Sequence, residues 1–247
     1  MTDSLTEYEQ RALDDLIKWQ EKMQSTTTYF GGMPKRLQNR INKIIPEKVH
    51  AAITAAIKQM TRGVIFGSGF TTARPILEAS LEERETKVLQ RIKFYKNTAA
   101  TEGALTGAGG ILLGLADFPI WLTLKMKLLH EVAALYGWDV KDYKERIYIL
   151  YIFQLTFSSQ TQRNKTYTLL ENWDTEAQNL PKDINEFDWR TFQLEYRDYI
   201  DIAKLLQLVP GIGAVVGAYV NHRLTKKLGN TAMNAYRMRW KAQKLLT

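Results

Sequence analysis

The glycine-rich apolar stretch 103–135 limits the fold more than any other part of the sequence. Gly103, Gly107, Gly110 and Gly114 recur at intervals of four, three and four residues, so one face of a helix there carries almost no side chains. Each glycine costs a helix about 0.5 to 1 kcal/mol relative to alanine. Close packing within the protein, or insertion into lipid, must offset this cost. The spacing therefore predicts that Gly107 and Gly114 face a neighbouring helix.

An Asp-Phe-Pro sequence at 117–119 interrupts the apolar stretch. Aspartate is a favoured N-cap residue and proline is tolerated in the first helical turn, so we expect a new helix to begin at Asp117. The apolar segment 103–124 has the length of a bilayer span, but the aspartate and the break near its middle argue against simple spanning. A second interpretation of Asp117 is a buried carboxylate with a raised pKa and a functional role.

The three-four spacing of apolar residues predicts helices along the rest of the chain. Expected helix starts are Ser4 with Glu7, Pro46, Ser80 with Glu83, Asp142 with Glu145, and Asp188; Gly137 is an expected helix end. The run 147–157, IYILYIFQLTF, is apolar on nearly all sides, and no second strand-like run exists to pair with it, so we expect a central buried helix.

A second apolar segment, 205–222, carries no charge and contains a Pro-Gly pair at 210–211. Gly213 and Gly217 lie four residues apart in it, as in the first glycine stretch. We expect the hairpin around Val209 to Gly213 to pack against the first glycine hairpin at the centre of the molecule. Because no linker is evident, the sequence predicts an all-α, single compact domain over residues 1–247, with about eight or nine helices and central glycine-rich hairpins.

Composition narrows the chemistry and the location. Apolar residues make up 45% of the chain, charged residues 24%, and the mean hydropathy is −0.30, values typical of a protein that purifies without detergent. The absence of cysteine excludes disulfides and thiolate metal sites. The acidic, polar start, MTDSLTEYEQRAL, is not a signal peptide, so the expected location is the cytoplasm.

The net charge of +8 is concentrated near the C-terminus. From residue 221 onwards there is no acid, and the basic residues are Arg223, Lys226, Lys227, Arg237, Arg239, Lys241 and Lys244. Such a block indicates an acidic surface as partner, either phospholipid or nucleic acid; a merely solvated helix face is the alternative. Helical spacing places Arg237, Lys241 and Lys244 together, which we expect to be a membrane-facing surface.

Other chemistries find no support in the sequence. The glycines at 211, 213 and 217 miss the dinucleotide-binding spacing and follow a helix, and the three histidines have no carboxylates at metal-ligand spacing. We therefore expect no cofactor, no metal and no catalytic residue. Nucleic acid is not an expected partner, because the basic block has one aromatic pair, Tyr236 and Trp240, and no recognition module.

Three long motifs resemble the EcsC family of bacterial proteins: GLADFPIWLTLKMKLLHEVAALYGWD at 114–139, ERIYILYIFQLTFSS at 145–159, and FQLEYRDYIDIAKLLQLVPGIGAVVGAYVNHRLTKKLGNTAMNAYRMR at 192–239. The family takes its name from an operon beside an ABC transporter associated with secretion. The resemblance therefore implies a bacterial origin and a link to the membrane, and it brings no established activity or catalytic residue.

Together these observations predict a non-enzymatic cytoplasmic protein that docks peripherally on the inner membrane or on a membrane complex. The alternative is an enzyme of lipid or cell-envelope metabolism, with the Asp117 carboxylate near its site.

Overall fold

The structure is a computed structural model that describes residues 5–25, 47–66, 74–107, 110–158, 160–199 and 214–242. These residues form nine α-helices and one 3₁₀ helix and include no strand, which confirms the predicted all-α class. The helices are α1 (Glu7–Gln24), α3 (Glu47–Phe66), α4 (Leu81–Gly107), α5 (Gly110–Leu135), α6 (Tyr143–Phe157), α7 (Gln160–Glu171), α8 (Trp173–Glu176), η2 (Ile184–Glu186), α9 (Trp189–Tyr199) and α11 (Ala214–Ala242).

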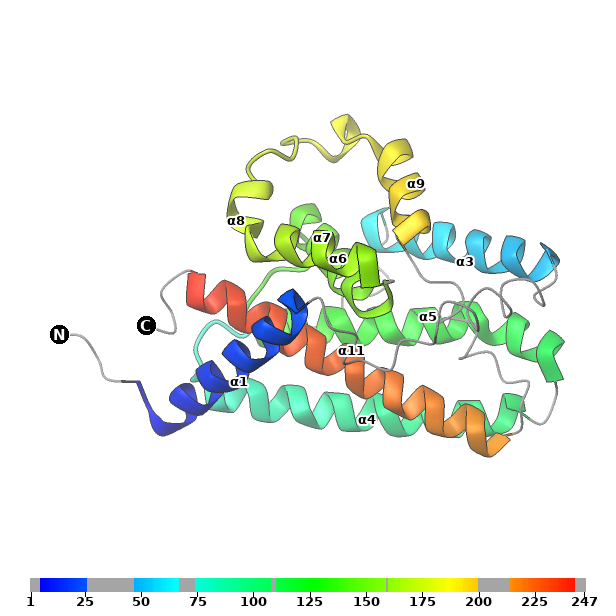
Figure 1. Cartoon of the computed structure of the whole chain (residues 1–247), viewed down its shortest axis with the longest axis horizontal. Helices are drawn as coiled ribbons and strands as arrows, with labels where there is room; N and C mark the ends of the chain where they lie inside the picture. The colour runs from blue at the N-terminus through cyan, green and yellow to red at the C-terminus, as the bar shows by residue number, and fades with distance from the viewer. Residues whose placement is uncertain are drawn as a thin grey trace.

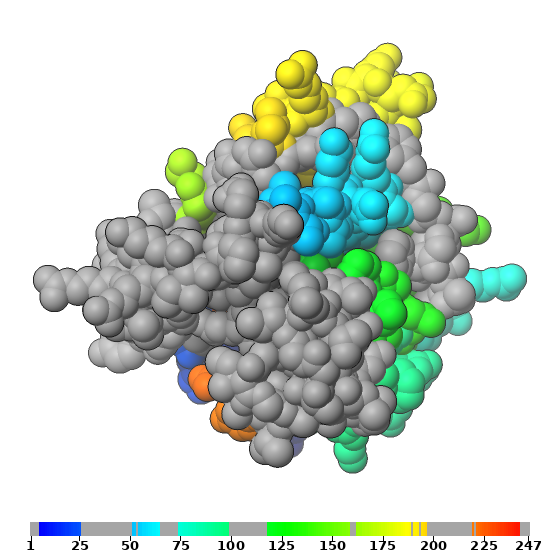
Figure 2. Space-filling view, turned by 90° about the vertical axis from the view of Figure 1, so that its right-hand side faces the viewer, coloured from blue at the N-terminus to red at the C-terminus, as the bar shows by residue number. Residues whose placement is uncertain are grey.

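The three longest helices, α4, α5 and α11, run along the length of the molecule (Figure 1). Helix α11 crosses α4, and α1 lies over the same region towards the end of α11. Helices α6 and α7 lie above α5 in this view, and α3 runs beside α5 below α9. Figure 2 shows the same order from the side, with α9 at the top, followed by α3, α5 and α4.

Three predicted helix starts and one predicted helix end agree with the structure. Ser80 and Glu83 form the expected capping box, with the Glu83 N–H donating to Ser80 Oγ at 3.2 Å. Asp142 and Asp188 each accept a hydrogen bond from a backbone N–H in the first turn of α6 and α9. Gly137 follows α5 with a φ of +96°, a conformation that favours glycine.

One predicted start is wrong. Helix α1 is capped by Thr6 and Glu9, whose side chain and backbone groups bond reciprocally, while Ser4 lies outside the described residues. The predicted pair, Ser4 with Glu7, and the observed pair, Thr6 with Glu9, are only two residues apart, and both have the Ser/Thr-x-x-Glu form. The motif alone therefore does not choose between them.

The expected break at Asp117 is also wrong. Helix α5 continues from Gly110 to Leu135 with Pro119 inside it, so Asp117 lies within a continuous helix. A proline inside a helix costs about 3 kcal/mol. Continuing the helix buries Phe118, Trp121 and Leu122, and the Trp121 indole donates to Asn221 of α11 at 2.6 Å. This packing offsets the cost of the proline.

The described residues show a close approach between helices at Gly229 of α11. A Cβ atom added there would lie 2.5 Å from Cγ1 of Ile92 on α4, closer than real Cβ contacts come. A side chain at this position would require the Ile92 side chain or one of the two helices to move. Gly107 and Gly114 lie at the end of α4 and within α5, but their surroundings are outside the described part of the structure, so their predicted packing stays a prediction.

Helix α6 occupies the centre of the core, as expected from its composition. None of its residues is exposed, and eleven of them are buried. The predicted hairpin at 209–213 lies outside the described residues, so its packing against the first hairpin is also still a prediction.

Candidate functional site

The structure divides the C-terminal basic block into an exposed part and a buried part. Arg223, Lys226 and Lys241 are exposed on α11, and Lys244 lies outside the described residues. Lys227 is half-buried and donates a hydrogen bond from Nζ to the Thr156 carbonyl of α6 at 2.8 Å. The block is therefore not one uniform surface.

The expectation that Arg237 faces a membrane is wrong. Arg237 is only 8% exposed, and its guanidinium binds Glu85 of α4 through Nε at 2.6 Å and through Nη2. The Glu85 carboxylate is fully buried and also accepts hydrogen bonds from the hydroxyls of Tyr8 and Tyr136, each at 2.8 Å. Four donors thus satisfy one buried carboxylate.

A second buried pair lies two residues further along α11. Arg239 donates from Nη1 to Glu145 of α6 at 2.5 Å, and the hydroxyl of Tyr236 donates to the same carboxylate at 2.6 Å. Burial raises the pKa of Glu145, and the positive charge of Arg239 opposes this shift. The rings of Tyr136 and Tyr236 stack with centroids 5.3 Å apart and so join the two pairs into one buried cluster.

This buried cluster fastens α11 to the helices around it. Its carboxylates come from α4 and α6, and its tyrosines from α1, from the turn that follows α5 and from α11. Burial raises the pKa of the Tyr136 and Tyr236 hydroxyls, which therefore stay protonated and act as hydrogen-bond donors. Because both carboxylates are buried and bonded to several donors, the arrangement suits a structural clamp rather than proton transfer to a substrate.

Sequence reasoning missed this cluster, although a signal for it existed. Glu85 falls in the apolar stripe of α4 between Leu81 and Val88, a position where an unpaired carboxylate would be costly. Glu145 was assigned to the start of α6 with Asp142, but Asp142 alone caps the helix and Glu145 turns into the core. An acid at a core position predicts a buried cation, without identifying which one.

The three histidines lie on separate helices, as the sequence indicates, and His130 of α5 is buried. Its Nδ1–H donates to the Met126 carbonyl at 2.8 Å. Burial lowers the pKa of His130 to about 4, and the positive charge of Arg146 acts in the same direction. No group of three or more metal-ligating side chains occurs within the described ranges.

Lowering the pH from about 7 to about 5 should destabilise the protein by about 2 kcal/mol through His130. The imidazole is neutral in the folded state but binds a proton near pH 6.5 when the chain unfolds. Its contribution to stability is therefore full above about 6.5 and is lost as the pH falls towards about 4. Urea denaturation at several pH values measures this slope. His130→Gln should flatten it, and His222→Gln should flatten it less, because His222 is less buried than His130; an unchanged slope in His130→Gln would contradict the assignment.

An exposed basic surface lies where α4 and α11 meet. We call it the α4–α11 basic face. It comprises five exposed residues, Leu89, Lys93, Tyr219, Arg223 and Lys226, and two half-buried residues, Lys96 and His222. The contact between Ile92 and Gly229 sets the register of the two helices. The pKa of His222 is lowered by burial and then by the positive charges of Lys96 and Lys226, which shows that cations from both helices gather there.

This face combines positive charge with exposed apolar surface. Residues 86–101 of α4 and all of α11 contain no acidic residue. Leu89 is 50% exposed and Tyr219 is 64% exposed, so this face presents two large apolar side chains beside its cations. Of the predicted binding residues, Arg223 and Lys226 belong to this face, whereas Lys227, Arg237 and Lys241 do not.

Of the remaining predicted residues, the structure describes at most the position in a helix. Asp117 lies inside α5 and not at its start, so it is not an N-cap, and the surroundings of its side chain are not described. Gly217 lies in the first turns of α11, and Gly213 precedes the described part of that helix. Among the helices that the structure describes, none has the length and hydropathy of a membrane span.

Comparison with known proteins identifies the family. The EcsC protein family model matches residues 10–240. The chain is 41% identical to "Protein EcsC" of Bacillus subtilis (strain 168) over 240 residues, which cover 97% of each chain. It is 28% identical to "Uncharacterized protein YdbA" of the same organism over 249 residues, covering 92% of this chain and 90% of that relative. No solved structure matches it. The chain belongs to the EcsC protein family.

Proposed function

We propose that this protein docks peripherally on the anionic surface of the inner membrane through the α4–α11 basic face, without an enzymatic activity of its own. The observation that supports this function is the coincidence of four cations, Lys93, Lys96, Arg223 and Lys226, with two exposed apolar side chains on two helix segments that contain no acidic residue. Basic side chains and interfacial aromatic groups are the two features by which proteins bind anionic bilayers.

The expected strength follows from the charges. A basic residue close to an anionic leaflet contributes about 1 kcal/mol, so four of them contribute about 3 to 4 kcal/mol, or a few hundred-fold in affinity. Leu89 and Tyr219 add apolar contact at the level of the headgroups. Binding of this strength is reversible and does not require any helix to enter the bilayer.

Vesicle sedimentation tests the proposal. Purified full-length protein should sediment with vesicles of phosphatidylcholine that contain about one-third phosphatidylglycerol, and it should stay in the supernatant with pure phosphatidylcholine. Binding should fall steeply as salt rises from about 0.05 to about 0.5 M, because screening shortens the range of the attraction. Equal binding to both kinds of vesicle, or no binding to either, would sink the electrostatic model and leave a membrane protein complex as the acidic partner.

A further inference from the structure

A cavity of about 110 Å³ lies between α6, α7 and α9, away from the α4–α11 basic face. Its lining residues are Tyr151, Gln154, Lys165, Thr166, Leu169, Phe192, Glu195 and Tyr196. One water molecule, which has a single non-hydrogen atom, needs about 10 to 15 Å³ of cavity volume. The cavity therefore has room for a molecule of roughly seven to ten non-hydrogen atoms. It is thus too large for a single water and small enough to select its ligand by size.

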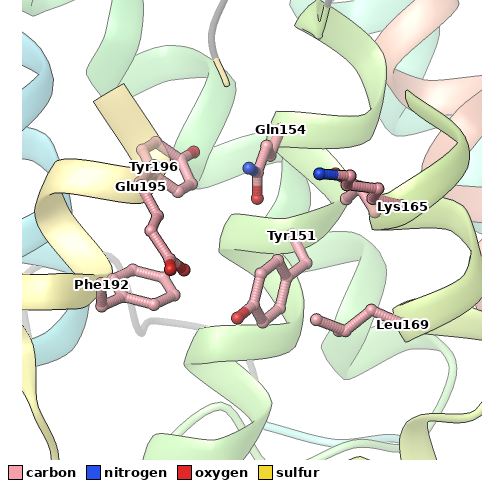
Figure 3. A pocket seen from close by; sticks show the side chains of 8 residues that line it. Tyr151, Gln154, Lys165, Leu169, Phe192, Glu195 and Tyr196 are labelled. Atoms are coloured by element: carbon pink, nitrogen blue, oxygen red, sulfur yellow. The ribbon is translucent and has the colours of Figure 1, made fainter. Parts of the chain in front are cut away.

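A buried acceptor points into this cavity. Gln154 of α6 is only 1% exposed, and its Oε1 atom has no hydrogen-bond partner among the described residues. Figure 3 shows its amide directed into the space between Glu195, Tyr151 and Lys165. Because a buried polar atom without a partner is costly, Gln154 Oε1 is suited to accept a hydrogen bond from a bound molecule.

Two opposite charges face the cavity from different helices. Glu195 of α9 and Lys165 of α7 lie on opposite sides of it (Figure 3). Both side chains are exposed at the rim, and neither has an ion-pair partner within the described part of the chain. A ligand that carries one positive and one negative group satisfies both of them.

The walls are aromatic on the side of Glu195. The rings of Tyr151 and Phe192 meet edge to face with centroids 5.6 Å apart, and Phe192 stacks on Tyr196 at 5.7 Å. The Tyr196 hydroxyl is already engaged, since it donates to the Leu150 carbonyl at 3.2 Å, so Tyr196 offers its ring to the cavity. Aromatic faces beside a carboxylate are a favourable environment for an ammonium group.

We propose that this cavity binds a compact zwitterion, specifically an amino acid with a small apolar side chain. The ammonium group lies between Glu195 and the aromatic rings and donates to Gln154 Oε1, and the carboxylate is directed towards Lys165. The apolar side chain packs against the aromatic rings and Leu169. This ligand site is independent of membrane docking, because the two sites share no residue.

L-valine, with eight non-hydrogen atoms, is the probe that fits this cavity. Ligands of this size reach dissociation constants of about 1 mM, which isothermal titration or saturation-transfer NMR detects with the full-length protein. Isobutylamine has the ammonium group and side chain of valine without the carboxylate, and isovalerate has the carboxylate without the ammonium group. Each should bind at least about ten times more weakly than valine, because each satisfies only one of the two charges.

Variants at the rim localise the binding. Glu195→Gln and Lys165→Gln should each weaken valine binding about tenfold or more, and both positions are exposed, so folding is unaffected. Glu186→Gln and Lys182→Gln make the same charge changes at exposed positions outside the cavity and should leave the affinity unchanged. Valine that fails to bind at about 10 mM, that binds equally to the rim variants, or that binds no better than isobutylamine would each overturn the proposal.

Discussion

Replacing Arg237 by methionine is expected to destabilise the protein by about 3 to 5 kcal/mol, measured as the loss of unfolding free energy in urea. The substitution keeps most of the side-chain volume but leaves the Glu85 carboxylate fully buried without its cation. Breaking a buried ion pair on one side has a cost of this size, because the remaining charge is neither solvated nor paired. Native proteins typically have a total stability of about 5 to 15 kcal/mol, so a loss of this size is a large fraction of the total.

Two further variants make this result specific to the buried pair. Lys241→Met removes a cation from an exposed position of the same helix and should change the stability by less than about 0.5 kcal/mol. The double variant Glu85→Gln with Arg237→Met should recover much of the loss, because the buried charge is gone. Equal stability of Arg237→Met and the unaltered protein would show that the pair does not hold α11 in place.

Changing Lys93, Arg223 and Lys226 together to glutamine should lower the affinity for anionic vesicles by about a hundred-fold. All three side chains are exposed on the α4–α11 basic face, so the fold should not change. The loss of about 1 kcal/mol for each cation gives about 3 kcal/mol in total. Sedimentation with vesicles of increasing concentration measures the partition coefficient, and circular dichroism verifies that the variant is folded.

A matched triple variant distinguishes the contribution of the α4–α11 basic face to vesicle binding from the contribution of the net charge. Lys18, Lys141 and Lys182 are exposed cations on other parts of the surface, and changing them to glutamine lowers the net charge by the same amount. This variant should retain most of its affinity. If both triple variants lose binding equally, the net charge of +8 and not the α4–α11 basic face causes the association.

Much of the fold was predictable because its signals are local. The Ser80 and Glu83 capping box and the glycine at 137 each act within a few residues, so the sequence identifies them directly. Arg237 shows the limit of such reasoning. It lies four residues before Lys241 on the same helix, yet one is buried and the other exposed. Arg237 is buried because it binds the carboxylate of Glu85, which lies 152 residues earlier in the chain. Helical spacing does not reveal such a contact.

The candidate surface was only partly predictable for the same reason. Arg223 and Lys226 follow from the basic block, but Lys93 and Lys96 belong to a different helix and join them through tertiary packing. The glycine that lets those helices meet is the isolated Gly229, not a member of the repeated glycine pattern. A repeated glycine spacing predicts a helix face with few side chains, whereas a single glycine at one close contact between helices produces no recognisable pattern in the sequence.

The two buried ion pairs also bear on how the chain folds as it is synthesised. Glu85 and Glu145 leave the ribosome long before the arginines that neutralise them, which are 152 and 94 residues further along the chain. Until α11 is made, an assembled core of α4 and α6 would hold two buried charges with no counter-ion. We therefore expect α4 and α6 to pack stably only after α11 has been synthesised. The core of the nascent chain should accordingly be completed late, after α11 has left the ribosome.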